Sequence, residues 1–209
     1  TTLRHRAGSQ DVQIVAQSVP YRDFFAVQET HLTHRRFDGT TSAVIKRAAF
    51  ISGDAVTVLP YDPQRKRVLL IEQFRAGPFA RGDAQPWSLE AIAGRIDAGE
   101  TPEVAARREA MEEAGLTLGP LHQIAAYYPS PGAMNEYLYS FVAICDLPDG
   151  TAGIHGLASE SEDIRGHLVS LDHLMDLVRS GEVNNAPLIL TAQWLALSAA
   201  TLLGDSGVT

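Results

Sequence analysis

The chain has 209 residues, 45% of them hydrophobic and 20% charged, which is ordinary for a globular protein of one large domain or one domain with a small appendage. Its net charge of −8, with scattered basic residues, argues against a nucleic-acid-binding protein, although a divalent cation can join an acidic site to a phosphate-bearing ligand. The single cysteine, Cys145, excludes an intramolecular disulfide and a cysteine-cluster zinc site. Because no signal segment and no membrane span stand out, we expect a soluble cytoplasmic protein with neither a membrane nor a nucleic-acid partner.

Residues 1–50 form a first region, in which strand-type residues dominate. The stretches 12–19, 24–32 and 41–50 are rich in Val, Ile, Phe and Thr, and an Asp-Gly pair at 38–39 is a tight-turn signal between the second and the third. We predict a small antiparallel β region. It has too few large apolar residues to be stable alone, so it must pack on the rest of the chain or on a second subunit.

Residues 51–209 form a second region, in which strands alternate with helices. A turn at 62–63 joins the first two strands, and a glycine-containing loop leads into the first helix. This interleaving predicts an α/β fold, with a mixed sheet covered by helices on both sides. The strands are expected at 55–60, 67–73, 87–92, 121–128, 137–145 and 164–170, the helices at 102–114, 171–179 and 186–203, and a long loop at 147–163.

The helix at 102–114 has clear signals at both ends. Thr101 is a good N-cap, Pro102 stands at the first helical position, and Gly115 suits the residue that follows the last helical turn. We expect the packing face of this helix to be supplied by Val104, Ala110, Met111 and Ala114.

Three carboxylates crowd one side of this helix. Glu109, Glu112 and Glu113 project within an arc of about 100° and therefore repel one another. Arg108 can pair with Glu112 but cannot neutralise all three, whereas a hard divalent cation with oxygen ligands would offset the repulsion. The alternative is a solvated, glutamate-rich helix surface, which is the commoner role of such a face taken alone.

The surrounding residues decide between these alternatives. The segment 94–116 fits the pattern G-x5-E-x7-R-E-U-x-E-E-x-G-U, in which U is aliphatic, and a chance match of its fixed positions is on the order of 10⁻⁸ to 10⁻⁹ per starting point. The sequence therefore resembles the Nudix family, which implies a loop–helix–loop metal site on an α/β/α sandwich. Only Ala110, at the first aliphatic position, is smaller than usual.

The resemblance assigns roles within this segment. It implies two or three Mg²⁺ ions, or Mn²⁺, bound by Glu109, Glu113 and the adjacent Glu112, with the backbone carbonyl of Ala93 completing the coordination. The arginine of the motif would orient the carboxylates, and a further glutamate would brace the loop. The structural motif positions are Gly94, Glu100, Arg108 and Gly115.

The acidic loop at 156–163 is the second candidate element. Three acids on a surface loop are usually just solvated, but in the enzymes that this chain resembles the loop supplies the catalytic base and a further metal ligand. On that likeness Glu160 is the general base and Glu162 a catalytic metal ligand, and the two roles could be exchanged. Asp163 is a third candidate.

Other matching stretches bear on the substrate. They include YRDFF at 21–25, VLLIEQFR at 68–75 and GIHGLASESEDI at 153–164, and Pro131 occupies the position of a proline found in family members that act on ADP-ribose. The likeness implies hydrolysis of ADP-ribose to AMP and ribose 5-phosphate. The alternatives are another nucleotide sugar such as GDP-mannose or ADP-glucose, a non-enzymatic ADP-ribose sensor, and a nucleotide-pool-cleaning triphosphatase.

The same likeness implies substrate contacts and an oligomeric state. Arginines would bind phosphate and ribose oxygens and an aromatic ring would stack on adenine, although a phenylalanine pair is more often part of a core. The family's homodimers exchange the N-terminal β region between subunits, which suits a region that cannot bury itself alone. The implied substrate-binding residues are Phe24, Phe25, Arg47 (beside Lys46), Arg75, Arg95, Ser130, Gly132 and Glu136.

Overall fold

The computed structural model describes residues 3–157 and 162–204, and the chain divides into two units. Unit 1 comprises Thr1–Gly53 and Ser130–Glu136, and unit 2 comprises Asp54–Pro129 and Tyr137–Thr209. Within the described residues, no helix has both the length and the apolar character needed to cross a membrane.

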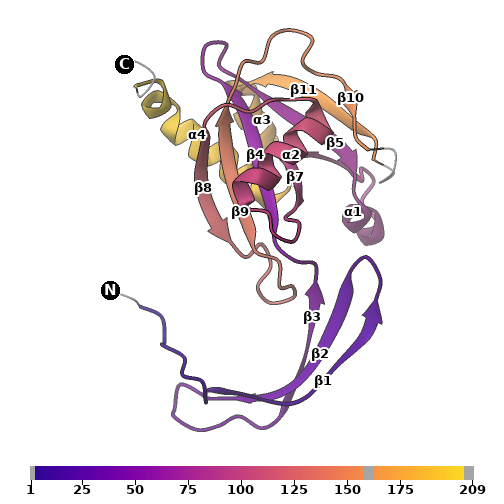
Figure 1. Ribbon diagram of the computed structural model, residues 1–209, viewed down its shortest axis with the longest axis vertical. Coiled ribbons are helices and arrows are strands. Elements are labelled where there is room, and N and C mark those ends of the chain that lie inside the picture. The colour runs from indigo at the N-terminus through magenta and orange to yellow at the C-terminus, as the bar shows by residue number, and fades with distance from the viewer. Residues whose placement is uncertain (1–2, 158–161, 205–209) are drawn as a thin grey trace. The chain divides into compact units, whose positions relative to one another are not determined.

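Unit 1 is built on a three-stranded antiparallel sheet in the order β1-β2-β3 (Figure 1). The strands are β1 (Val12–Arg22), β2 (Ala26–His34) and β3 (Ile45–Ile51). Every residue of β1 is exposed, and no hydrophobic residue among the described residues up to Gly53 is fully buried. The predicted antiparallel β region is therefore present, and in a single chain it lacks a core of its own.

The loop 130–136 belongs to unit 1 although it is distant from it in sequence. The backbone N–H of Phe50 donates to the carbonyl of Ala133 at 2.8 Å, and the N–H of Asn135 donates to the carbonyl of Phe50 at 3.0 Å. The side-chain oxygen of Asn135 accepts a further bond, from the N–H of Ser52, at 3.0 Å. These bonds attach the loop to the end of β3.

Unit 2 contains an eight-stranded mixed sheet (Figure 1). Its order is β10-β11-β5-β4-β9-β8, with β6 paired to β5 and β7 paired to β4. The pair β4 and β9 is parallel and the other pairs are antiparallel. The bounds are β4 Ala55–Asp62, β5 Arg67–Phe74, β6 Trp87–Glu90, β7 Ile92–Arg95, β8 Leu121–Tyr127, β9 Leu138–Ile144, β10 Ile154–His155 and β11 Ile164–Ser170.

One expected strand is divided between two neighbours. β4 and β5 pair at only two positions beside their connecting turn and then separate. The segment 87–95 fills the gap, because β6 pairs with β5 and β7 pairs with β4. The prediction of a single strand at 87–92 is therefore wrong. The segment changes its partner from β5 to β4, and the point of change depends on where those two strands separate.

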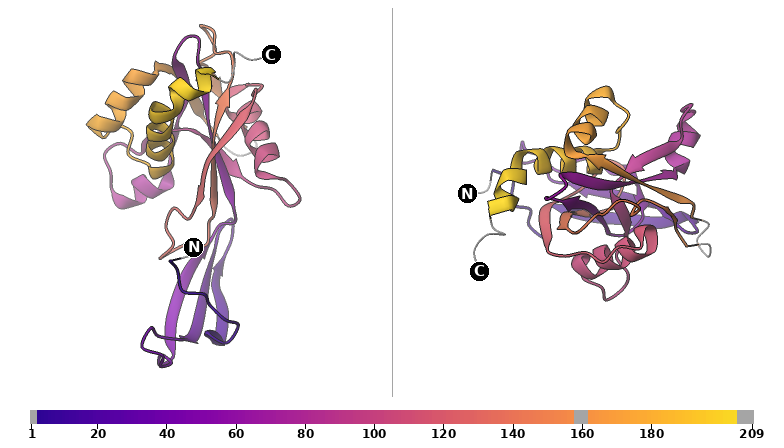
Figure 2. Two further views of the ribbon diagram at one scale, coloured as in Figure 1. Left: turned by 90° about the vertical axis from the view of Figure 1, so that its left-hand side faces the viewer. Right: turned by 90° about the horizontal axis from the view of Figure 1, so that it is seen from above.

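Helices cover both faces of this sheet (Figure 2). α2 (Pro102–Ala114) lies on one face, and α3 (Leu171–Ser180) and α4 (Ala186–Gly204) lie on the other. Because side chains alternate along a strand, Leu69 of β5 joins the core beneath α2, whereas Leu70 joins the core beneath α3 and α4. The predicted α/β/α sandwich is confirmed.

Two small elements lie where the sequence does not indicate them. α1 (Ala76–Arg81) follows β5 and has no buried residue. Its Gly77 and Pro78 are poor helix formers, so local propensity argues against it. β10 occupies two residues of the segment expected to be a loop at 147–163, and it forms because β11 offers it an edge.

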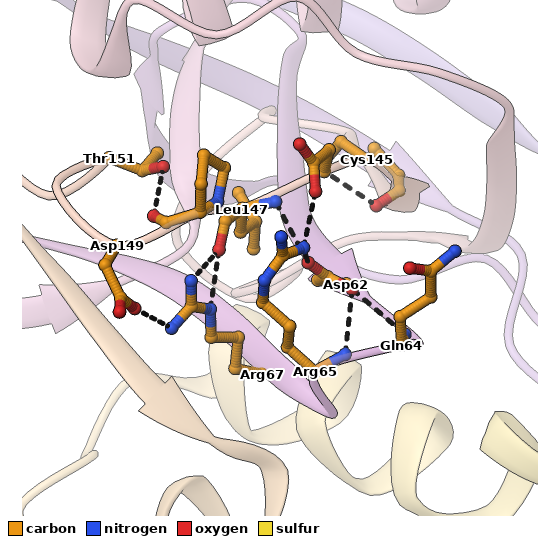
Figure 3. A network of polar contacts seen from close by, with 11 residues as sticks. Asp62, Gln64, Arg65, Arg67, Cys145, Leu147, Asp149 and Thr151 are labelled. Carbon is orange, nitrogen blue, oxygen red and sulfur yellow. Dashed lines mark hydrogen bonds and ion pairs between the residues drawn. The ribbon is translucent and has the colours of Figure 1, made fainter.

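A buried carboxylate holds the turn between β4 and β5 (Figure 3). Asp62 accepts hydrogen bonds from the backbone N–H groups of Gln64 at 2.9 Å, Arg65 at 3.0 Å and Leu147 at 3.0 Å, and from the Arg65 side chain at 2.6 Å. Burial works to raise the pKa of Asp62, but these bonds lower it to about 2. The Arg67 guanidinium also donates to the carbonyl of Leu147, so this network ties the turn to the chain that follows β9.

Candidate active site

The glutamate-bearing helix α2 has the ends that its sequence predicts. The side-chain oxygen of Thr101 accepts a bond from the N–H of Val104 at 3.4 Å, and Pro102 is the first helical residue. Gly115 adopts a left-handed φ of 62°, and its N–H donates to the carbonyl of Met111 at 3.0 Å. This conformation is available to glycine at little cost, and it ends the helix at Ala114.

The packing face of α2 differs from the one expected. Val104 and Met111 are 52% and 51% exposed, so their predicted packing role is wrong. The alanines let the helix approach the sheet closely, and Val104 and Met111 lie on the sides of the helix that point away from the sheet. The buried residues of the helix are Ala105, Ala106, Glu109, Ala110, Glu113 and Ala114.

Two glutamates share this buried face with the alanines. Glu113 is 2% exposed and accepts bonds from the backbone N–H of Ala93 at 2.9 Å and from the Gln73 side chain at 3.4 Å. Glu109 is 9% exposed, and its carboxylate lies directly over Gly94. A Cβ added at Gly94 would stand 1.9 Å from Glu109 Oε1, so this cradle needs a residue without a side chain.

Both carboxylates lie where negative charge is disfavoured. Burial, with the charges of Glu109 and Glu162, raises the pKa of Glu113 to about 8, against the opposing effects of the Ala93 hydrogen bond and the Arg75 charge. Burial likewise raises the pKa of Glu109, although Arg108 opposes this. A divalent cation would supply the missing positive charge, so the residues present fit a metal of the hard, oxygen-binding type.

Arg108 donates hydrogen bonds to several parts of the motif. Its guanidinium makes two bonds of 3.0 Å to the carboxylate of Glu100 and one of 2.8 Å to the carbonyl of Arg95. It also donates to Glu109 at 2.6 Å and to Glu112 at 3.1 Å. The pKa of Glu100 is lowered, chiefly by its bond to Arg108. Arg108 therefore links the loop before the helix to two of the motif carboxylates.

The chain approaching β11 brings Glu162 to this helix. Glu162 Oε2 accepts a bond from the N–H of Leu157 at 3.1 Å, and the Glu162 N–H donates to the Leu157 carbonyl at 3.2 Å. The charge of Glu162 contributes to the raised pKa of both Glu109 and Glu113. Asp163 is exposed, and Glu160, the predicted base, lies outside the described residues.

A glutamate that sequence reasoning missed engages Arg75. Glu90 of β6 accepts two bonds from the Arg75 guanidinium, at 3.0 and 2.6 Å. Burial opposes the charge of Arg75, but the bonds to Glu90 and the charges of Glu113 and Glu162 raise its pKa overall. The available signal was a charged residue between Leu89 and Ala91 in a predicted strand.

The predicted substrate-binding residues divide between the two units. Arg75 and Arg95 lie in unit 2, and the other six lie in unit 1. Within unit 1, Phe24 is 71% exposed and packs edge-to-face on Phe25, which in turn contacts Phe50, with ring centroids 4.7 Å apart in each pair. Arg47 lies on β3 and donates to the carbonyl of Lys46 at 2.8 Å. Ser130, Gly132 and Glu136 lie on the loop that is bonded to β3.

The described residues do not by themselves assemble a complete metal site. Across 3–157 and 162–204, no three His, Cys, Asp or Glu side chains are grouped closely enough to hold an ion. Glu109 and Glu113 form the buried pair, and Glu112 is turned toward Arg108. Ala93 is placed beside this pair through its N–H bond to Glu113.

Comparisons with known proteins identify the chain's relatives. A NUDIX domain family model matches residues 52–192. The ADP-ribose pyrophosphatase of Escherichia coli (strain K12) is 40% identical over 190 residues, 91% of this chain and 90% of that protein. That of Haemophilus influenzae is 36% identical, covering 92% and 89%, and the GDP-mannose pyrophosphatase of Salmonella arizonae is 28% identical, covering 91% and 97%. A solved structure described as an ADP compounds hydrolase superposes with a TM-score of 0.66 at 23% identity, covering 92% of this chain and 98% of that one.

The sandwich and its glutamate-bearing helix define an α/β protein with two buried carboxylates on the face of a helix that packs on the sheet. The family model spans more than half of the chain, and the similar proteins align over about nine-tenths of it. The chain belongs to the Nudix family and is a Nudix hydrolase.

Proposed function

We propose that the chain hydrolyses the pyrophosphate bond of ADP-ribose to AMP and ribose 5-phosphate, with Mg²⁺ as its metal and Mn²⁺ as a substitute. The observation that carries the hydrolytic part is the pair of buried carboxylates: Glu109 packs over Gly94, Glu113 accepts the Ala93 N–H, and burial raises the pKa of both. The choice of ADP-ribose is supported by the two ADP-ribose pyrophosphatases at 40% and 36% identity.

The proposed ligands of two or three metal ions are Glu109, Glu112, Glu113, Glu162 and the carbonyl oxygen of Ala93. Bound divalent ions would neutralise the pyrophosphate and lower the pKa of a bound water. For Glu112 to contribute, its carboxylate must share or leave its bond to Arg108, which is 3.1 Å long. The bond is partly exposed, so solvent weakens it and the exchange is inexpensive.

The chain's own residues supply the remaining chemistry. Glu160 accepts the proton of the attacking water and Glu162 holds metal, or the two exchange roles. Arg108 and Glu100 keep the helix carboxylates in place. Gly94 leaves room for the Glu109 carboxylate beside the backbone, and Gly115 adopts the left-handed conformation that ends α2. Arg75 presents its charge to the phosphates. The two bonds to Glu90 orient this guanidinium, so less freedom is lost when substrate binds.

We assign residues 1–50 to dimerisation and substrate binding, and residues 51–209 to the catalytic domain. The support is the set of exposed apolar side chains of β1, in which Val12, Ile14, Val15 and Tyr21 are all more than half exposed. A second copy of the chain that exchanges this region would cover these side chains. Its Phe24 would then stack on adenine, with Phe25, Arg47, Ser130, Gly132, Glu136 and, from unit 2, Arg95 near the substrate.

The test is incubation of purified protein with ADP-ribose and Mg²⁺ in ¹⁸O-water, with GDP-mannose and ADP-glucose in parallel. We expect AMP and ribose 5-phosphate, and the labelled product identifies the phosphorus that is attacked. Glu109→Gln should lower kcat by at least about tenfold, as expected for a metal ligand. Glu103→Gln, an exposed change on the same helix, is the matched control.

The second candidate is hydrolysis of another nucleotide sugar, which the 28% identical GDP-mannose pyrophosphatase favours. A higher kcat/KM for GDP-mannose or ADP-glucose than for ADP-ribose would establish it in place of the first. Binding of ADP-ribose without turnover would instead indicate a sensor, although every glutamate of the motif is present.

A further inference from the structure

A histidine outside the motif is wedged between two glycines in unit 2. His155 is the last residue of β10, and its imidazole lies beside Gly115 and Gly153. A Cβ added at Gly153 would lie 2.9 Å from His155 Nε2, and one added at Gly115 would lie 3.4 Å from His155 Cε1. The ring therefore fills a slot that a side chain at Gly153 would obstruct, and it lies within van der Waals reach of Gly115 at the end of α2.

This slot lies between the two segments that carry the candidate metal ligands. On one side, Gly115 ends α2 two residues after Glu113. On the other, His155 is followed by Gly156, whose φ is 106° and whose added Cβ would lie 2.8 Å from the Cβ of Glu162. The end of the helix thus packs against the imidazole of His155, and the next residue in the chain, Gly156, packs against Glu162.

The Nε2 atom of the imidazole does not stabilise this slot through a hydrogen bond. His155 Nε2 is buried, and it is the one buried side-chain nitrogen or oxygen without a hydrogen-bond partner among the described residues. An unpaired buried polar atom lowers stability, and an apolar side chain of similar shape would avoid that loss. What the ring contributes is its rigid, flat shape, which sets a fixed spacing.

We infer that His155 is a positioning residue: its ring sets the separation between the end of α2 and Glu162, so that the carboxylates of the helix and the carboxylate of Glu162 bind the same cation. This inference rests on the proposed metal-dependent function, because it concerns how the ligands of that site are held together. Groups that orient metal ligands affect metal affinity although they do not touch the ion.

The test uses one variant that displaces the ring and a second variant that removes it. Gly153→Ala pushes on the imidazole, since the three atoms nearest to the new Cβ all belong to His155 and the Gly153 φ is not in the left-handed region. His155→Ala empties the slot, and the double variant combines both changes. Gly77→Ala is the matched control, because a Cβ there meets nothing within 4 Å.

The first measurement is the dissociation constant of Mn²⁺ alone, followed by electron paramagnetic resonance at a temperature where thermal unfolding shows each variant to be folded. We expect each single variant to raise this constant about tenfold and Gly77→Ala to leave it unchanged. The double variant should match His155→Ala, because the added methyl then has no ring to displace. In turnover, kcat for ADP-ribose should fall while KM stays within about twofold of the wild-type value.

Two results would overturn the inference. One is an unchanged Mn²⁺ constant in Gly153→Ala and His155→Ala, which would make the ring simple packing. The other is an effect of Gly153→Ala that persists at full size when His155 is already Ala, which would place the effect in the backbone. If wild-type protein binds Mn²⁺ and the variants weaken it, but ADP-ribose is not hydrolysed, the proposed substrate fails while the positioning role stands.

Discussion

Glu113→Gln removes the most deeply buried carboxyl group of the candidate site while keeping an acceptor for the N–H of Ala93. Glu113 is 2% exposed, and burial together with nearby carboxylates raises its pKa from 4.5 to about 8. A raised carboxyl pKa means that the folded, metal-free protein holds a proton that the unfolded chain releases. This group's contribution to stability is therefore complete below about pH 4.5 and is lost as the pH rises through about 8.

The size of the effect follows from the same two values. At about 1.4 kcal/mol per pKa unit, a change from 4.5 to about 8 weakens the metal-free fold by roughly 5 kcal/mol in the free energy of unfolding once the carboxyl is ionised. Burial raises the pKa of Glu109 as well, so its effect has the same sign. The opposite shift of Asp62, to about 2, acts only at lower pH and does not cancel this loss.

The assay is urea unfolding in the presence of a chelator at about pH 5 and about pH 8, for wild type, Glu113→Gln and the exposed control Glu103→Gln. Wild type and the control should lose several kcal/mol of unfolding free energy between the two pH values, whereas Glu113→Gln should lose much less. Excess Mg²⁺ should restore wild type most strongly at the higher pH, because the cation replaces the proton as the partner of the carboxylate. Parallel pH dependences in wild type and Glu113→Gln would refute the reasoning.

Three further variants test other parts of the structure. Gly94→Ala places a methyl 1.9 Å from Glu109 Oε1, so the buried carboxylate must shift. We expect kcat to fall about tenfold or more and the melting temperature to fall as well, and an unaltered kcat would contradict the cradle. Arg108→Lys replaces a planar donor by a single ammonium that cannot bond Glu100 twice, so kcat should fall about tenfold, and the metal concentration needed for half-maximal activity should rise. Asp62→Asn should lower the unfolding free energy by roughly 2 kcal/mol near pH 7. Because the pKa of Asp62 is depressed, this difference between variant and wild type should shrink as the pH falls through about 4 toward 2. Denaturant titrations of both proteins near pH 7 and near pH 2 check it.

The candidate site shows how far local sequence carries the argument. Thr101, Pro102 and Gly115 predict the bounds of α2 because capping is a local interaction among neighbours in the chain. The helical spacing of Glu109 and Glu113 places them on one side, but it cannot say whether that side faces solvent or the sheet. The same limit explains the error at Val104 and Met111, which are apolar yet lie away from the sheet.

The sequence by itself determined the α/β class, the N-terminal antiparallel strands, the glutamate-bearing helix and the family resemblance, since each rests on periodicity, end signals or a fixed motif. The tertiary structure alone decided which residues meet. It separated β4 from β5 so that β6 and β7 fit between them, and it set Glu90 on Arg75. It laid the Glu109 carboxylate over Gly94 and wedged His155 beside the end of α2. The physical reason is that these contacts join segments far apart in the chain, and their geometry depends on how the whole sheet twists and packs.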